Sequence, residues 1–311
     1  MYDPHVEGRE VDTSVEETVE KRTKRSLPSK DSEKEVLPAK RRRVGKKLLP
    51  IEDSEASSDK DNLMSQMSIQ TIIDAAKQLE RIPELIQSVR DAGFGPFIDT
   101  KIKGSINRKC MSFILKNIDT STMTVTFSEE KKIEINRYAI HHLYGIPNGH
   151  LSAPRPNETS EVLPELKREL GFKSDEDINA KKLLVILTSM VDGHLSSKAV
   201  INKNLALKIF YLILLNKGLC VGVGPRITAK EASMVKGLDY GKIKDMDFCQ
   251  LVVDELQTSA TNWQAYKELK YKHMEGLAVA PLIMYLDSLI YKDLAHMGKE
   301  TPRVLVLDEK S

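Results

Sequence analysis

Apolar residues recur at helical spacing along most of the chain from about residue 63 onward. The first such stripe predicts a helix that is built on Met64, Met67, Ile72, Ala76 and Leu79. A second helix is expected to begin at Pro83, because proline is tolerated at the first helical position. The same spacing predicts further helices at 105–117, 159–170, 177–191, 198–215, 228–236, 245–258, 261–272 and 280–292.

Two of these segments indicate where the core lies. The stretch 205–215 is apolar nearly all round, which is typical of a central, buried helix. The segment 245–258 is amphipathic, which predicts a surface helix with one apolar side. Its apolar stripe is Phe248, Cys249, Val252, Val253 and Leu256, and its polar side is Asp247, Gln250, Asp254 and Gln257.

A strict alternation of apolar and polar residues is found between residues 122 and 135. Three threonines alternate with apolar residues over 122–127, and Ile133 and Ile135 flank Glu134. A polar connection of four residues, 128–131, joins the two runs. This pattern predicts one small antiparallel β-hairpin.

A short helix is expected directly after the hairpin. Asn136 is a candidate N-cap, Gly145 stands where a left-handed C-terminal residue is favoured, and Pro147 prevents continuation. The fold class predicted for the chain is therefore mainly α, a compact multi-helix domain with one small β-hairpin.

The first 62 residues differ in composition from the rest. They contain 14 Lys and Arg and 15 Asp and Glu, with Tyr2 as the only aromatic residue. Such a segment has too little apolar surface to offset the entropy of ordering it. We therefore predict a disordered charged tail at 1–62, a helical module at 63–295 and a C-terminal tail at 296–311.

The net charge and the cysteine content exclude some classes of protein for this chain. The net charge of the whole chain is only +2, which excludes a uniformly basic nucleic-acid binder. Three widely spaced cysteines, Cys110, Cys220 and Cys249, argue against a disulfide framework and favour a reducing compartment. No apolar run approaches the ~20 residues of a membrane helix, so we expect no membrane association.

Catalytic or metal-binding chemistry is not predicted. His141 and His142 are adjacent and so point about 100° apart on a helix, and no pair of ligands has zinc-site spacing. Cys249 lies on an apolar stripe and Cys220 in a glycine-rich loop, so both are expected to pack as neutral thiols. We expect no catalytic residue, no metal and no cofactor.

A basic run in the tail is the most informative motif. Six of the eight residues 40–47 are cations, and two basic pairs lie about fifteen residues upstream. An exposed, extended peptide of this kind suits an acidic groove on a nuclear import receptor. The predicted import signal consists of Lys40, Arg41, Arg42, Arg43, Lys46 and Lys47 with Lys21, Arg22, Lys24 and Arg25.

Aromatic residues near the C-terminus raise a nucleic-acid alternative. Trp263, Tyr266, Tyr271, Tyr285 and Tyr291 are mixed with Lys267, Lys270, Lys272 and Lys292, which suggests a basic–aromatic face. Core packing is the simpler interpretation for Trp263 and Tyr285.

The order of several landmarks resembles a plant protein family. These landmarks are Ala92–Gly95, Ile133–Ile135, Ile140–Gly149, Asp245–Asp254 and Ala280–Leu289. Together they are similar to the aminotransferase-like plant mobile domain, the helical module of plant transposon-related proteins. In that family the module stands alone or precedes a SUMO-protease-type (Ulp1-like) cysteine peptidase. The resemblance covers roughly residues 68–292 and implies no catalytic residue in this chain.

These observations favour a non-enzymatic nuclear interaction module that binds an import receptor and protein or chromatin partners. One alternative is a nucleic-acid-binding protein that uses the basic tail and the lysine-rich C-terminal helices, with weak affinity. A second is a catalytically incomplete fragment of a peptidase protein, because the chain ends at Ser311 before any peptidase domain.

Overall fold

The computed structural model describes residues 62–102, 108–128, 131–155, 161–197, 199–265, 271–290 and 302–305. By its internal contacts the chain divides into two units, 1–57 and 58–311, and every described residue belongs to the second. The predicted disordered tail and its basic run therefore lie outside the described residues, apart from Asn62, which begins a strand.

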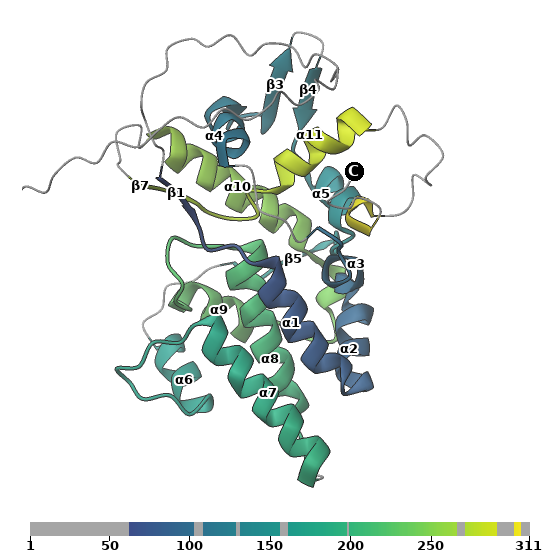
Figure 1. Cartoon of the computed structure of the whole chain (residues 1–311), viewed down its shortest axis with the longest axis vertical. Coiled ribbons are helices and arrows are strands. Elements are labelled where there is room, and N and C mark those ends of the chain that lie inside the picture. Colours follow the sequence, from purple (N-terminus) through teal and green to yellow (C-terminus); the bar gives the residue numbers. More distant parts are fainter. Residues whose placement is uncertain are drawn as a thin grey trace, which may run out of the picture. The chain divides into compact units, whose positions relative to one another are not determined.

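The described part is mainly helical, as predicted, with small β elements (Figure 1). The longer helices are α1 (Ile69–Glu80), α2 (Pro83–Val89), α4 (Arg108–Asn117), α5 (Arg137–Tyr144), α6 (Val162–Glu169), α7 (Ala180–Ser197), α8 (Lys203–Leu214), α9 (Ala229–Lys236), α10 (Phe248–Ala265) and α11 (Ala280–Ile290). Short turns are η1 (Arg90–Phe94), α3 (Gly95–Ile98), η2 (Leu215–Leu219), η3 (Ile243–Asp245) and η4 (Arg303–Leu305).

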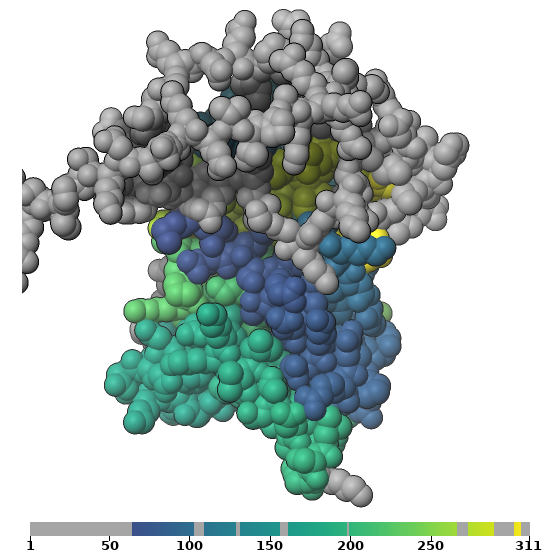
Figure 2. All heavy atoms as spheres, in the orientation of Figure 1, coloured from purple at the N-terminus to yellow at the C-terminus, as the bar shows by residue number. Residues whose placement is uncertain are grey.

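Helix α8 lies at the centre of one helical group, as its all-round apolar sequence predicts. Its residues 209–214 are all buried, and helices α1 and α7 pack beside it (Figure 1). On the surface, α1, α2 and α7 share one face of the molecule (Figure 2). Local N-terminal caps start two of these helices. Asn202 caps α8 by accepting a hydrogen bond from the Leu205 amide, and Thr228 and Glu231 form a capping box on α9.

The predicted hairpin is present and has a third strand. Strands β3 (Thr124–Ser128) and β4 (Lys131–Glu134) pair antiparallel, and β2 (Ile118–Asp119) extends the sheet on the other side of β3. Val125 is buried opposite Ile133. This additional strand, β2, follows α4 directly in the chain, so Ile118 continues the apolar stripe of that helix into the sheet.

Two short parallel strand pairs were not predicted. Strand β1 (Asn62–Ser65) pairs with β7 (Tyr271–Met274), and β5 (Leu151–Ser152) pairs with β6 (Met246–Asp247). The prediction that Met64 belongs to the first helix is therefore wrong. The predicted helix at 261–272 is confirmed at 261–265, which belong to a helix, and is wrong at 271–272, which begin β7. Backbone pairing between distant segments overrides the local spacing at both places.

Helix α10 also differs from its prediction. It runs without a break from Phe248 to Ala265, and Ser259 and Ala260, which lie between the two helices predicted here, are buried within it. Its apolar stripe is buried as expected. Asp247, expected on the solvent side, is buried instead and pairs with Arg137, with 2.5 Å between the Nη1 and Oδ2 atoms.

Residues 302–305 lie within the C-terminal tail predicted from residue 296 and pack against the body of the module. Residues 303–305 form η4, in which Arg303 and Val304 are buried. Arg303 pairs with Asp287 of α11, a contact between residues that no local pattern connects.

Gly145 ends α5 as predicted, and its replacement gives a first testable result. Its φ of 65° is left-handed, and an added Cβ would lie 2.6 Å from the Cγ atom of Pro302. We expect Gly145→Ala to lower the free energy of unfolding by about 1–3 kcal/mol in chemical denaturation. Gly193 of α7 is the matched control, because a Cβ there meets nothing within 4 Å. Gly193→Ala should stabilise by about 1 kcal/mol, and equal losses at both sites would contradict this account.

Candidate functional site

Two of the three cysteines pack in the hydrophobic core. Cys220 and Cys249 are buried, and burial raises the pKa of each thiol well above its ordinary value. The Cys249 Sγ donates a weak hydrogen bond to the Ile146 carbonyl at 3.4 Å. These positions confirm the prediction that both residues pack as neutral thiols. Cys110 differs, since it is exposed on α4.

Thiol labelling tests this assignment. We expect a neutral-pH thiol reagent to modify Cys110 in the folded chain and to leave Cys220 and Cys249 unmodified, because their thiolates are disfavoured and covered. All three should react after unfolding in denaturant. Peptide mass mapping would locate the label, and rapid native modification of Cys220 or Cys249 would contradict the assignment.

The described histidines show no arrangement suited to binding a metal ion. His141 and His142 lie on α5, where the Nδ1 atom of His141 is 2.7 Å from the Ile146 carbonyl and His142 is exposed. Within the described ranges no group of three or more His, Cys, Asp or Glu side chains is placed to hold a metal ion. His5 and His296 lie outside those ranges.

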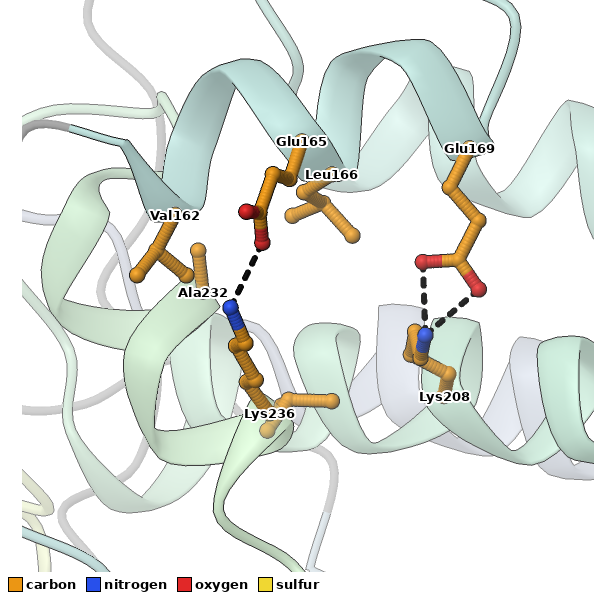
Figure 3. A pocket seen from close by; sticks show the side chains of 8 residues that line it. Val162, Glu165, Leu166, Glu169, Lys208, Ala232 and Lys236 are labelled. Carbon is orange, nitrogen blue, oxygen red and sulfur yellow. Dashed lines mark hydrogen bonds and ion pairs between the residues drawn. The ribbon is translucent and has the colours of Figure 1, made fainter.

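A shallow groove lies where α6 crosses α8 and α9 (Figure 3). It encloses about 260 Å³, and its apolar lining comes from Val162, Leu166, Ala232 and Val235. Two ion pairs cross it. Lys236 donates to Glu165 at 2.6 Å, and Lys208 contacts both oxygens of Glu169 at 2.5 and 2.6 Å. Its charged groups satisfy one another, so the groove holds α6 in place and presents no unpaired charge to a ligand.

An exposed set of aromatic and aliphatic side chains is the stronger candidate site. Phe113 of α4, Phe127 of β3 and Tyr285 of α11 form what we call the aromatic row, and the exposed Leu286 follows Tyr285 on α11. The ring centroids of Phe113 and Phe127 are 6.3 Å apart, and Phe127 stacks on Tyr285 at 4.2 Å. Phe113 is 49% exposed and Leu286 is 44% exposed. Three elements thus join to present apolar surface to solvent.

A cation lies at the edge of this row. The Lys131 ammonium is 4.9 Å from the centroid of the Tyr285 ring, which is a cation–π distance. Aromatic side chains with a basic rim are typical of the energetic centres of protein interfaces. The same chemistry also suits stacking with bases, so the row bears on both functions expected from the sequence.

The aromatic residues that the sequence singled out near the C-terminus differ in burial. Trp263 is buried, which confirms its packing role, whereas Tyr285 is only partly buried and belongs to the aromatic row. Tyr271 and Lys272 begin strand β7. The other residues predicted to form a basic–aromatic face with them lie outside the described residues: Tyr266, Tyr291, Lys267, Lys270 and Lys292. The same holds for all ten residues of the predicted import signal.

Sequence reasoning did not find the aromatic row. Phe113 stands off the apolar stripe of its helix, and this was the one available signal, because an aromatic residue on a polar helix face is unusual. Phe127 was assigned to the alternating pattern of its strand. A register irregularity between Thr126 and Ser128 interrupts that pattern, and Phe127 is only partly buried against α11.

Comparison with known proteins adds a family but no activity. A family model described as a domain of unknown function (DUF8566) matches residues 65–279. No curated protein matches the sequence, and no solved structure does. Among the helices that the structure describes, none is both long and apolar enough to cross a membrane.

Proposed function

Because the chain belongs to this DUF8566 family, whose description states no function, we propose a function from its own residues: a non-enzymatic protein-interaction module that works in the nucleus. The aromatic row is the observation that carries the proposal. Large rings held rigidly at the surface bind a partner with little loss of side-chain entropy, and their exposure to water is unfavourable until a partner covers them.

The chemistry of the core supports a binding role. Two of the three cysteines are buried packing groups, and the charged side chains of the α6–α8–α9 groove are paired with one another. Among the described residues, the exposed side chains of the aromatic row are apolar and aromatic, which is the composition of the centre of a protein interface.

Nuclear location is proposed from the tail alone. The basic run from Lys40 to Lys47 supports binding to an import receptor. The resemblance to the plant mobile domain stays a prediction and is consistent with a nuclear role. A reporter fused to residues 1–62 should accumulate in nuclei, and alanine at 40–43 should abolish this. Cytoplasmic retention of the unmodified fusion would refute the import signal.

The interaction proposal is tested by capture with matched variants. The tagged full chain, the double variant Phe113→Ser/Leu286→Asp and the control Val185→Asp are each incubated with nuclear extract, with and without nuclease. Val185 is a suitable control because it is 65% exposed and lies on α7, a helix that contributes no residue to the row. We expect at least one protein to be retained by the wild type and the control after nuclease treatment, and to be lost by the double variant.

Two other outcomes would decide against the proposal. Retention that nuclease removes, together with an affinity for nucleic acid that falls steeply with salt, would favour the nucleic-acid alternative. Capture that the double variant leaves unchanged would show that the row does not bind a partner.

A further inference from the structure

The segment 302–305 packs against α3, α5 and α11, and we call the surface that it covers the groove. Val304 is fully buried, and its carbonyl accepts hydrogen bonds from the Thr100 hydroxyl at 3.3 Å and the Lys101 amide at 3.5 Å. Pro302 packs against Gly145, where a Cβ would leave it no room. These are the contacts of a bound peptide: backbone hydrogen bonds, a buried aliphatic side chain and a proline against a glycine.

The ion pair between Arg303 and Asp287 determines which residue can occupy this position. Arg303 is 1% exposed, and its Nε atom donates to Oδ1 of Asp287 at 2.8 Å. Its Nη2 atom lies 2.7 Å from the same oxygen, and it makes no hydrogen bond to any residue that the structure describes. A buried guanidinium requires its carboxylate, because either charge alone would be strongly unfavourable there.

A cavity remains beside this ion pair. It encloses about 160 Å³, with apolar walls from Ile133, Leu143 and Met284 and polar groups from Glu134, His142 and Ser288. Within residues 302–305, Arg303 is the residue that lines this space. A peptide with a longer side chain at this point would gain contacts that residues 302–305 lack.

We propose that this groove is a docking site for a linear Pro-Arg-aliphatic peptide of a partner protein, and that residues 302–305 occupy it in cis until such a peptide displaces them. Residues 302–305 show which peptide chemistry fits the groove. Asp287 pairs with a cationic side chain, and the buried position of Val304 accommodates an aliphatic one. Residues 302–305 belong to the same chain as the groove, so they compete at high effective concentration, and a partner binds only when its peptide makes additional contacts. The site uses other residues than the aromatic row, so either proposal can fail without the other.

The test uses the full chain and a fluorescein-labelled peptide with the sequence of residues 299–308. In anisotropy titrations, we expect the variant Arg303→Ala to bind this peptide at least ten-fold more tightly than the wild type, because its own segment no longer competes. Adding Asp287→Lys should remove that binding. A peptide with aspartate at position 303 should then bind the Asp287→Lys/Arg303→Ala chain and should not bind the Arg303→Ala chain.

A folded Arg303→Ala chain that binds no more tightly than the wild type, or a charge exchange that restores nothing, would overturn the proposal. Should Arg303→Ala fail to fold, the wild-type chain provides the same test. A peptide with a photo-crosslinking residue at position 304, in large molar excess, should crosslink to residues 97–101 or 143–146. The matched peptide with glutamate at position 303 should not, and equal crosslinking by both peptides would refute selection by Asp287.

Discussion

Replacing Phe94 with alanine is expected to lower the free energy of unfolding by about 3–5 kcal/mol. Phe94 is fully buried in η1, between two other elements. Its ring meets Phe248 of α10 edge-on at 5.3 Å and Tyr211 of α8 at 5.9 Å. The substitution removes the apolar contacts of the whole ring and both aromatic pairs, and neighbouring side chains from three elements cannot all move to fill the space.

Phe113 provides the matched control for this change, since the same atoms are removed from a half-exposed position. We expect Phe113→Ala to cost less than about 1 kcal/mol, because about half of that residue's surface already contacts water. Denaturant unfolding followed by far-UV circular dichroism measures both variants. Similar losses for the two variants would contradict the placement of Phe94 in the core and of Phe113 in the aromatic row.

The features that the sequence predicted well are those with local causes. The side chain of Asn136 accepts a hydrogen bond from the amide of Ala139, three residues on, and Gly145 adopts a conformation that depends on its own lack of a Cβ. Such signals need no knowledge of the rest of the chain. The same is true of the central helix α8, whose sequence is too apolar for a surface position.

The errors come from contacts between distant segments. Met64 fits helical spacing, yet its backbone pairs with His273 in a parallel strand pair. Helical spacing over a few residues does not distinguish a helix from a short strand next to one, and the partner strand is invisible locally. Asp247 and Arg303 were misplaced for a related reason. A charged residue is predicted to be exposed unless its partner is known, and each partner lies far away in the sequence.

The two proposed sites could not have been derived from the sequence for the same reason. The aromatic row combines α4, β3 and α11, and the peptide groove combines α3, α5 and α11. Nothing in the spacing of Phe113, Phe127 and Tyr285 indicates that their rings come together. Only the packing of α11 across the hairpin and α4 brings the three into contact.

Replacing Asp247 with alanine is expected to lower the free energy of unfolding by about 2–4 kcal/mol. Its Oδ1 atom accepts a hydrogen bond from the Gln250 amide at 2.8 Å, at the start of α10. Its Oδ2 atom pairs with Arg137, which also donates to the carbonyls of Asn148 and Gly149 at 3.2 and 2.8 Å. The alanine variant loses the cap of a long core helix and leaves a partly buried guanidinium without its counter-charge.

Asp247→Asn separates the two contributions, because asparagine keeps an oxygen for the cap and loses the charge. We expect about half of the loss seen with alanine. Asp192→Ala serves as the control, since its pair with Arg81 lies on the surface, and surface pairs contribute less than about 1 kcal/mol. Chemical denaturation measures the three variants. If Asp247→Ala were no more destabilised than Asp192→Ala, Arg137 and Asp247 would not hold α5, the 146–149 turn and α10 together.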